Sequence, residues 1–302
     1  MRSYRQDYTK NEVRQILFRI GHFRAYRYLL KIRKIQRLSS SNVQHYYSDK
    51  YFEKYMGGTE RISNTSPPPP DMAVKESGSL EGKRILDFGC GRGDLIMHAI
   101  SSNATEILGI DYSQNAIDKS HKLLRRKNIT KDVKVSLACG GIDILHSIER
   151  QTFDIVFLTD VLEHISTIEA AKLLKQLHRI IDKNDYIVFV TPNGSNIFHG
   201  YNVDFFYYPL LYYYLFRTQS KKTSYSEFFV EDLYYQYLLH INILSYSELY
   251  NLFKNNGFNP VIKFEENESV SINKVKKYLH LFCNTALASN LYGRAIKNDH
   301  FF

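Results

Sequence analysis

The sequence has few cysteines, and their spacing does not suit a zinc site. Cys90, Cys139 and Cys283 are the three cysteines among its 302 residues. Small disulfide scaffolds carry many more cysteines, and structural zinc sites place theirs in close pairs. Both classes are therefore excluded, and we expect the protein to work in a reducing compartment.

Long apolar stretches are also missing. The basic N-terminal residues are not followed by the apolar run of a secretory signal. No stretch approaches the run of about 18 apolar residues that a membrane-spanning helix needs. The composition, 44% hydrophobic and 24% charged, is that of a globular protein. We therefore expect a cytoplasmic location, with peripheral contact to a membrane as the remaining membrane role.

Charge is unevenly distributed along the chain. The first 55 residues carry 13 basic and 4 acidic side chains, whereas the rest carries 27 of each. The net charge of +9 is therefore confined to the N-terminal region. The absence of net charge after residue 55 argues against an extended nucleic-acid-binding surface on that part of the protein.

Short apolar strands alternate with helical patterns from residue 82 onward, which is typical of a parallel α/β sheet covered by helices. The expected strands are 85–89, 106–111, 133–139, 154–160, 185–191, 259–264 and 290–298. The expected helices are 93–102, 113–127, 168–181, 245–258 and 274–286.

Three segments lie outside this alternation. Residues 11–37 have the pattern of a basic amphipathic helix, and residues 63–72 contain a proline run that predicts a linker or mobile loop. We therefore divide the chain into a helical extension with an aromatic segment and a linker (1–74) and an α/β domain (75–302). The aromatic-rich residues 198–243 interrupt the alternation and predict a helical insertion.

The first predicted strand runs into a glycine-rich turn, DFGCGRGD. Gly89, Gly91 and Gly93 allow the backbone to turn tightly and to bring N–H groups and a helix N-terminus to a ligand. Their spacing is not that of a dinucleotide fingerprint, and Asp87 before them would repel a pyrophosphate. Asp87 suits a cation, such as a sulfonium with an amino-acid tail. Asp111, at the end of the second strand, is placed to accept hydrogen bonds from two ribose hydroxyls.

At these residues the chain resembles the class I S-adenosylmethionine-dependent methyltransferases, of the type similar to quinone-pathway O-methyltransferases. The resemblance extends over residues 82–300 and includes the segments GIDYS, FDIVFLTDVLEHI and LLKQLHRIIDKNDYIVFVTPN. It implies a Rossmann-like, doubly wound α/β sheet of seven mostly parallel strands, the last antiparallel. It also implies S-adenosyl-L-methionine as cofactor, bound by Asp87, Gly89, Cys90, Gly91, Gly93, Asp111, Tyr112 and Asp160.

Within that set, the resemblance assigns the methionine moiety to Asp87 and the glycines, the ribose to Asp111 and the adenine ring to Tyr112. One departure concerns the adenine amino group, for which the family places an acidic residue just after the third strand. Here that stretch reads CGGID, and the nearest acidic residue is Asp143. Either Asp143 reads the adenine from a shifted position, or the backbone alone does.

The segment TDVLEHI follows the fourth strand, where a parallel sheet opens its ligand crevice. One interpretation makes His164 the general base for a hydroxyl acceptor, with Glu163 as the second catalytic residue. A second makes both residues supports of the loop. A third has Asp160, Glu163 and His164 bind Mg²⁺ or Mn²⁺. We assign no metal ligand.

The aromatic insertion and the basic helix each have three interpretations. The insertion forms a lid over a hydrophobic acceptor, a membrane-docking patch or a small core of its own. The basic helix forms a solvated face over the site, a contact for anionic lipid or a nucleic-acid arm. By the resemblance, residues 46–58 form a lid segment over cofactor and substrate, and the insertion 198–243 covers the acceptor site.

These observations predict an enzyme of small-molecule biosynthesis that methylates an oxygen atom of a small apolar or lipid-linked acceptor. The preference for oxygen over nitrogen or carbon rests on His164. Two alternatives are an RNA methyltransferase and a non-catalytic binding protein with the same fold.

Overall fold

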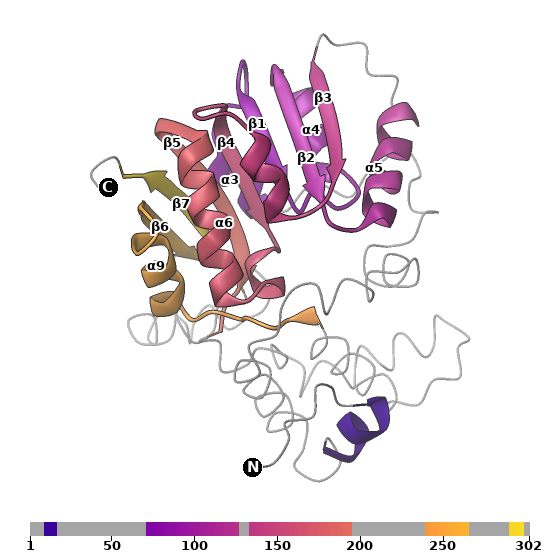
Figure 1. The fold of residues 1–302 in the computed structure, drawn as a ribbon, viewed down its shortest axis with the longest axis vertical. Coiled ribbons are helices and arrows are strands. Elements are labelled where there is room, and N and C mark those ends of the chain that lie inside the picture. Colours follow the sequence, from indigo (N-terminus) through magenta and orange to yellow (C-terminus); the bar gives the residue numbers. More distant parts are fainter. Residues whose placement is uncertain (1–8, 17–70, 127–132, 195–238, 266–289, 299–302) are drawn as a thin grey trace, which may run out of the picture.

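The computed structural model describes residues 9–16, 71–126, 133–194, 239–265 and 290–298 (Figure 1). Within these residues, seven strands form one sheet in the order β3-β2-β1-β4-β5-β7-β6. The strands are β1 (Arg84–Phe88), β2 (Glu106–Asp111), β3 (Lys134–Cys139), β4 (Phe153–Thr159), β5 (Ile181–Pro192), β6 (Phe258–Phe264) and β7 (Asn290–Lys297). Strands β1 to β5 pair in parallel, whereas β7 runs antiparallel to both β5 and β6. The predicted fold is confirmed, including the antiparallel last strand.

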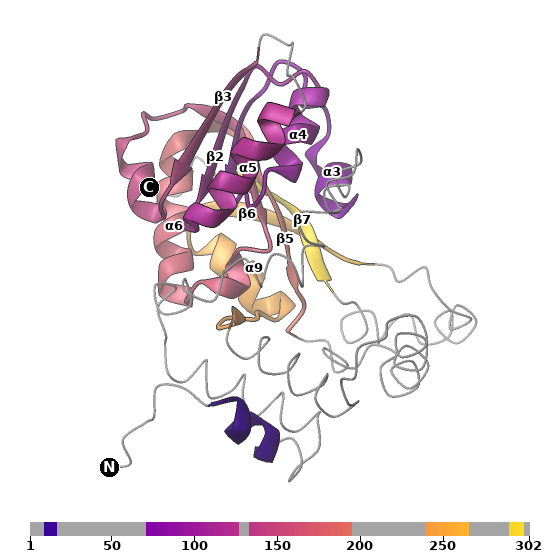
Figure 2. The same cartoon turned by 90° about the vertical axis from the view of Figure 1, so that its right-hand side faces the viewer.

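Helices cover both faces of the sheet. They are α3 (Asp71–Ser77), α4 (Asp94–Ser101), α5 (Gln114–Arg126), α6 (Thr167–Ile180) and α9 (Tyr246–Lys254), with the short 3₁₀ helices η3 (Ile142–Ser147) and η4 (Leu162–His164). Helices α3, α4 and α5 pack on one face, and α6 and α9 pack on the other (Figure 2). Since neither face of the central strands meets water, those strands read as continuous apolar runs.

Alternate side chains of strand β4 pack into the hydrophobic clusters on the two faces of the sheet. Ile155 and Phe157 point to the side of α4, whereas Val156 and Leu158 point to the side of α6. All four side chains are at most 1% exposed. Alternation across the strand thus joins the two helix layers through a single sheet.

Capping residues fix where the two helices on the second face begin. Ser166 before α6 and Ser245 before α9 each form a capping box, with Glu169 and Glu248 respectively. Past the end of α9, Gly257 takes a φ of 87°, which glycine adopts at little cost. Helix α9 begins one residue after the predicted start, but it ends at Lys254 with Asn255 as its C-cap, so it is shorter than predicted and Gly257 lies in the turn beyond its end.

Helix α3 was not expected from the sequence pattern. It starts directly after the proline run and packs on β5 and β7, with Ala73 fully buried. Arg294 donates from Nε to the Glu76 carbonyl and lies 4.8 Å from the centre of the Tyr186 ring. The Tyr186 hydroxyl in turn donates to the Ser77 carbonyl at 2.7 Å. These contacts attach α3 to the sheet.

Several predicted segments lie largely outside the described residues. Of the basic helix, residues 10–16 are helical and begin with a capping interaction between Thr9 and Glu12. The lid segment 46–58, most of the insertion and the predicted helix 274–286 are not among the described residues. In the described part of the chain, no helix combines the length and the apolar character needed to cross a membrane.

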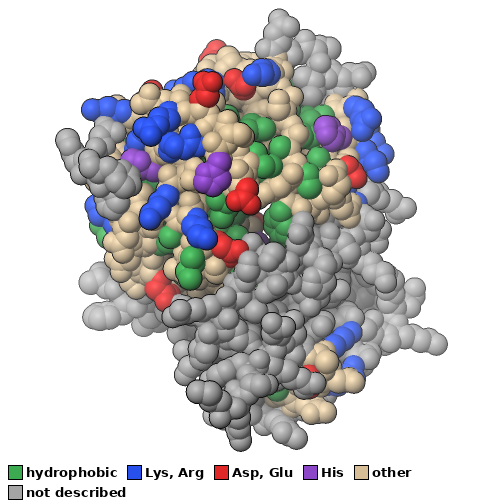
Figure 3. Space-filling view, viewed as in Figure 1, with side chains coloured by type: hydrophobic (Ala, Val, Ile, Leu, Met, Phe, Trp, Pro, Cys, Tyr) green, Lys and Arg blue, Asp and Glu red, His purple; other side chains and the backbone are tan. Residues whose placement is uncertain are grey.

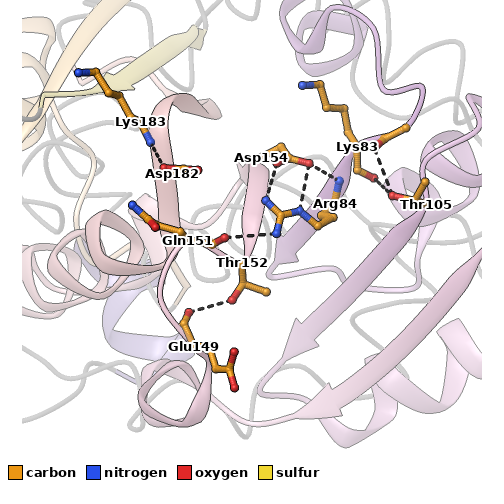
Figure 4. A network of polar contacts seen from close by, with 10 residues as sticks. Lys83, Arg84, Thr105, Glu149, Gln151, Thr152, Asp154, Asp182 and Lys183 are labelled. Carbon is orange, nitrogen blue, oxygen red and sulfur yellow. Dashed lines mark hydrogen bonds and ion pairs between the residues drawn. The ribbon is translucent and has the colours of Figure 1, made fainter.

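The amino ends of β1 and β4 are joined by an ion pair between Arg84 and Asp154 (Figure 4). The guanidinium donates to the carboxylate at 2.7 Å, and the Arg84 backbone N–H donates to the same carboxylate at 2.7 Å. The Gln151 carbonyl accepts a further bond from the guanidinium at 3.2 Å. This network lies at the amino ends of the central strands, on the opposite side of the sheet from the carboxyl ends of these strands.

Candidate functional site

The carboxyl ends of β1, β2 and β4 bring three segments together. The chain order of the sheet reverses at β1, and a parallel sheet opens a crevice at such a point. The glycine loop follows β1, and its Gly89 and Cys90 N–H groups donate to the Ile110 carbonyl at 2.7 and 3.0 Å. The loop is therefore tied to the end of β2. The η4 turn follows β4 on its other side.

The three glycines of the loop differ in what surrounds them. All have positive φ, at 81° for Gly89, 53° for Gly91 and 91° for Gly93. A Cβ on Gly89 would lie 2.5 Å from Val161 Cγ2, and one on Gly93 would lie 2.5 Å from Ser120 Oγ. A Cβ on Gly91 would meet nothing within 4 Å. Gly91 therefore leaves the backbone open to a ligand, whereas the other two allow close packing.

Asp87 places a carboxylate beneath the glycine loop. The residue is 2% exposed, and its Oδ2 atom has no hydrogen-bond partner among the described residues. Burial, together with the smaller effects of the charges of Asp111 and Asp94, raises its pKa to about 7. A buried carboxylate with an unsatisfied oxygen is costly unless a cation or a donor meets it.

Asp111 is held in one orientation by the backbone. Its Oδ2 accepts from the Gly91 N–H at 2.9 Å, and its Oδ1 accepts from the Ser113 N–H at 2.8 Å. Burial nevertheless raises its pKa, against the lowering effect of these two bonds. Each oxygen keeps a second lone pair, so the carboxylate can still accept bonds from two hydroxyls.

The remaining predicted cofactor residues lie around this centre. Cys90 is buried in the glycine loop, and burial raises the pKa of its thiol. The Tyr112 carbonyl lies 3.7 Å from the Sγ atom of Cys139, which places the segment after β2 beside the end of β3. Asp143 is exposed in the first turn of η3. Its proposed contact with adenine stays a prediction.

The turn after β4 begins with a strained residue. Asp160 has a φ of 53°, and its N–H donates to the Val190 carbonyl of β5 at 3.0 Å. The left-handed region is uncommon for a residue other than glycine, and such strain is often found at functional sites. Desolvation by the surrounding protein raises the pKa of Asp160 to about 6, and the charge of Glu265 adds to the effect.

Glu163 is the most deeply buried acidic residue of the turn. It is 1% exposed, and the Thr191 hydroxyl donates to its Oε2 at 3.0 Å. Burial raises its pKa well above the ordinary value, and the charge of Asp160 raises it further. Its backbone carbonyl accepts from the N–H groups of Ile241 and Asn242 at 2.9 and 3.0 Å. These bonds attach the segment before α9 to the η4 turn.

His164 lies beside Glu163, and His240 joins them from the segment before α9. The Nδ1 atom of His164 lies 2.9 Å from the Leu239 carbonyl, so this nitrogen carries the proton and Nε2 carries the lone pair. Burial lowers the pKa of His164 to about 4. The centres of the His164 and His240 rings are 5.0 Å apart.

His240 is the residue that the sequence analysis missed. It is distant in sequence from Glu163 and His164, and it lies in the mostly apolar segment LLHINI without another metal-binding or catalytic residue type beside it. The hydrogen bonds between its segment and η4 run between backbone groups or from a side chain to a backbone carbonyl, so they carry no signal in the residue type at position 240. The structure brings the two predicted acceptor-side residues together and adds this third one.

A family model described as a methyltransferase domain matches residues 44–263. The ubiquinone biosynthesis O-methyltransferase of Coxiella burnetii is 29% identical over 124 residues, which are 40% of this chain and 49% of that protein. The protein of the same name from Alkalilimnicola ehrlichii is 27% identical over 139 residues, covering 46% of this chain and 53% of the relative. The chain thus spans about half the length of the curated relatives it matches.

Among solved structures, a SAM-dependent methyltransferase from Archaeoglobus fulgidus matches with a TM-score of 0.51 at 17% sequence identity. The match covers 83% of this chain and 100% of the other. At this identity the likeness shows the fold, and it agrees with the order of strands described above.

Proposed function

The chain belongs to the methyltransferase-domain family, and from this premise we propose that it transfers a methyl group from S-adenosylmethionine to an oxygen of a small, apolar or lipid-linked acceptor. The observation that carries the cofactor assignment is the buried Asp87 carboxylate with its unpartnered Oδ2. A cationic amino-acid tail offers this oxygen the donor that the described protein does not. When bound, the cofactor supplies an electrophilic methyl group on a positively charged sulfur.

The residues around the glycine loop fit this cofactor. The open side of Gly91 lets the backbone approach the ligand, and the N–H of the loop is aligned by Asp111. The free lone pairs of Asp111 would accept the two ribose hydroxyls. In this proposal Tyr112 packs against the adenine ring, and Cys90 and Gly93 shape the loop beneath the methionine moiety. Asp143 or the nearby backbone would read the adenine amino group.

Two observations support a small oxygen acceptor. The matched relatives from Coxiella burnetii and Alkalilimnicola ehrlichii are named as ubiquinone biosynthesis O-methyltransferases. The chain beyond its first 55 residues carries 27 basic and 27 acidic side chains, which does not suit a long polyanionic substrate. On the described face in Figure 3, Lys and Arg side chains lie among acidic and histidine side chains.

On the acceptor side, the residues of the η4 turn would position the hydroxyl. His164 presents the lone pair of Nε2, because its Nδ1 proton is engaged by Leu239. Thr191 fixes one oxygen of Glu163 and leaves the other on the side of His164. A hydroxyl held here would be oriented for in-line attack on the methyl group, which is the main task of the protein in such a displacement.

Calorimetric titration of S-adenosylmethionine and S-adenosylhomocysteine tests the cofactor assignment. We expect micromolar binding to the wild type and a loss of at least tenfold in Asp111→Ala. Asp118→Ala, an exposed aspartate on α5, is the matched control and should bind as the wild type does. A well-folded wild type that binds neither ligand would refute the proposal and favour a non-catalytic binding protein.

The acceptor class is tested by methyl transfer to defined substrates. A prenylated catechol, a water-soluble catechol and a structured RNA should be offered at equal concentration with a labelled cofactor. We expect a methyl ether on the prenylated catechol, identified by mass spectrometry. Transfer to RNA alone, with binding that weakens steeply as salt rises, would favour the nucleic-acid alternative.

A further inference from the structure

Three side chains from two distant segments, one buried and two partly buried, meet beside the proposed acceptor position. The possible ligand atoms of Glu163, His164 and His240 all lie within 4.8 Å of one another. His164 Nε2 and Glu163 Oε1 are 3.9 Å apart. Asp160, which the sequence had grouped with the first two, is not a member of this cluster. The structure therefore replaces one carboxylate of the expected set by a second imidazole.

The charge of Glu163 is not balanced by a basic side chain. Among the described residues, no lysine or arginine lies within ion-pair distance of its carboxylate, which is 1% exposed. Thr191 supplies one hydrogen bond to Oε2, and the Oε1 atom faces His164. Buried carboxylates of this kind are typically paired or bound to metal ions, because an uncompensated charge in the interior is costly.

The imidazole of His164 is oriented as a metal ligand is oriented. A ligating histidine usually donates its second N–H to a carbonyl or carboxylate, which fixes the tautomer and directs the lone pair at the metal. His164 has this arrangement with the Leu239 carbonyl at 2.9 Å. Leu239 directly precedes His240, so one short segment orients one imidazole and supplies the other.

The segment that carries His240 is fixed on both sides of it. Leu239 accepts from His164, and the Ile241 and Asn242 N–H groups both donate to the Glu163 carbonyl. The position of His240 relative to Glu163 is therefore set by backbone bonds as well as by side-chain packing. Such support is what a preorganised site requires.

We propose that Glu163, His164 and His240 form a binding site for a divalent transition-metal ion. Two imidazole nitrogens and one carboxylate suit Zn²⁺, Mn²⁺, Co²⁺ or Fe²⁺ better than Mg²⁺ or Ca²⁺, which prefer oxygen ligands. Bonds of about 2.0–2.2 Å would draw the three ligand atoms inward from their present separation. Three protein ligands leave coordination positions open, as in catalytic rather than structural sites.

The proposed metal site lies next to the glycine loop. Val161, two residues before Glu163, is the residue that would contact a side chain on Gly89. A metal ion with an open position here would be placed to bind an acceptor oxygen. This inference goes beyond the proposed function, because metal binding is measured on the protein without cofactor or acceptor.

The test is a titration of the metal-free protein of residues 1–302 with Co²⁺ alone, followed by its visible absorption. We expect one Co²⁺ per chain with the intensified absorption of a site of low coordination number, and its displacement by one equivalent of Zn²⁺. Glu163→Gln and His240→Ala should each weaken Co²⁺ binding at least tenfold. His121→Ala, which removes an exposed histidine on α5, should leave it unchanged.

Absence of saturable Co²⁺ binding would overturn the inference, as would wild-type affinity in both cluster variants. Should His240→Ala fail to fold by circular dichroism, Glu163→Gln decides the matter, because the amide keeps the shape of the side chain and an oxygen for Thr191. A parallel titration with S-adenosylhomocysteine separates the two proposals. Cofactor binding without Co²⁺ binding would refute only the metal site, and the reverse result would refute only the proposed function.

Discussion

Val161 Cγ2 lies in the space where a side chain on Gly89 would begin, because a Cβ built on Gly89 would be 2.5 Å away from it. Gly89 belongs to the glycine loop after β1, whereas Val161 precedes η4 after β4. Since η4 carries Glu163 and His164, this contact joins the proposed cofactor side to the proposed acceptor side. The space left by the missing side chain of Gly89 therefore allows the two sides to pack closely.

Replacing Gly89 by alanine should disrupt this contact. The new Cβ would collide with Val161 and would sit on a backbone with a φ of 81°, which alone costs about 1–2 kcal/mol for a residue with a side chain. We expect a fall in the unfolding temperature and at least a tenfold loss of cofactor affinity by calorimetry. The double variant Gly89→Ala/Val161→Ala should recover part of both losses.

Gly91→Ala is the matched control for stability. Its φ is also positive, at 53°, but its Cβ would meet nothing within 4 Å. We therefore expect it to lower the unfolding temperature less than Gly89→Ala does. Equal losses in the two variants would show that backbone strain, and not the contact with Val161, determines the effect.

Cofactor affinity should depend on pH through Asp87. Its pKa of about 7 means that the carboxyl is largely protonated at pH 6 and largely ionised at pH 8. Since the ionised form attracts the cationic cofactor, affinity for S-adenosylmethionine should rise over this range and be linked to release of a proton. Calorimetry in buffers of different ionisation enthalpy measures that proton. Asp87→Asn should show neither the proton release nor the pH dependence.

The same residue should reduce the stability of the cofactor-free protein. An acid whose pKa is raised on folding disfavours the folded state as pH rises from its unfolded pKa of about 3.9 to its folded pKa. Asp87→Asn should therefore unfold at a higher temperature than the wild type at pH 8, with a gain of about 2–4 kcal/mol. At pH 4 the two proteins should be equally stable. A variant less stable at both pH values would contradict this account.

Asn242 should position the η4 turn. Its side chain donates to the Leu162 carbonyl at 3.3 Å and accepts from the Thr167 hydroxyl at 3.1 Å, and it is 3% exposed. Asn242→Ala leaves both partners unsatisfied, and we expect a loss of about 1–3 kcal/mol in urea unfolding. Asn259→Ala, which removes a surface contact with Lys254, should cost much less.

The ion pair at the opposite edge of the sheet should affect stability without affecting binding. Burial tends to raise the pKa of Asp154, but hydrogen bonds and the charge of Arg84 outweigh it and lower the pKa. The resulting stabilisation is present above the unfolded pKa of about 3.9 and is lost as pH falls through the folded pKa. Since the Arg84 side chain is 37% exposed, Asp154→Asn should cost about 1 kcal/mol at neutral pH. Urea unfolding at neutral and acid pH, beside cofactor titration, measures both effects.

The strands of the sheet and the helices on it other than α3 could be predicted because each carries a local signal. Strand β2 begins and ends where the apolar run EILGID predicts, and α6 begins one residue after its capping serine. Strand β5 starts earlier than expected, at Ile181, because pairing with Phe153 extends it through the polar residues at its beginning. Pairing across a sheet is a tertiary effect, and local sequence does not encode it.

The candidate site likewise has one part with a local sequence signal and another part that depends on tertiary contacts. The glycine loop and Asp111 are recognisable because their chemistry lies within a short stretch of sequence. His240 is not recognisable, because backbone bonds between remote segments bring it to Glu163. Local motifs therefore predict the proposed cofactor side of the site, whereas the proposed acceptor side requires the fold.

The chain leaves the sheet after β5 and returns close to the point of departure. The Gly194 N–H donates to the Leu244 carbonyl at 2.8 Å, so the two ends of the intervening segment are joined by a backbone bond. A loop closed on a fixed base can change in length at a small entropic cost, since doubling its length adds only about 0.6 kcal/mol. The length and sequence of the segment between Gly194 and Leu244 can therefore change without a large loss of stability. Under the proposed function, such a change would alter the acceptor while the glycine loop and Asp111 stay the same.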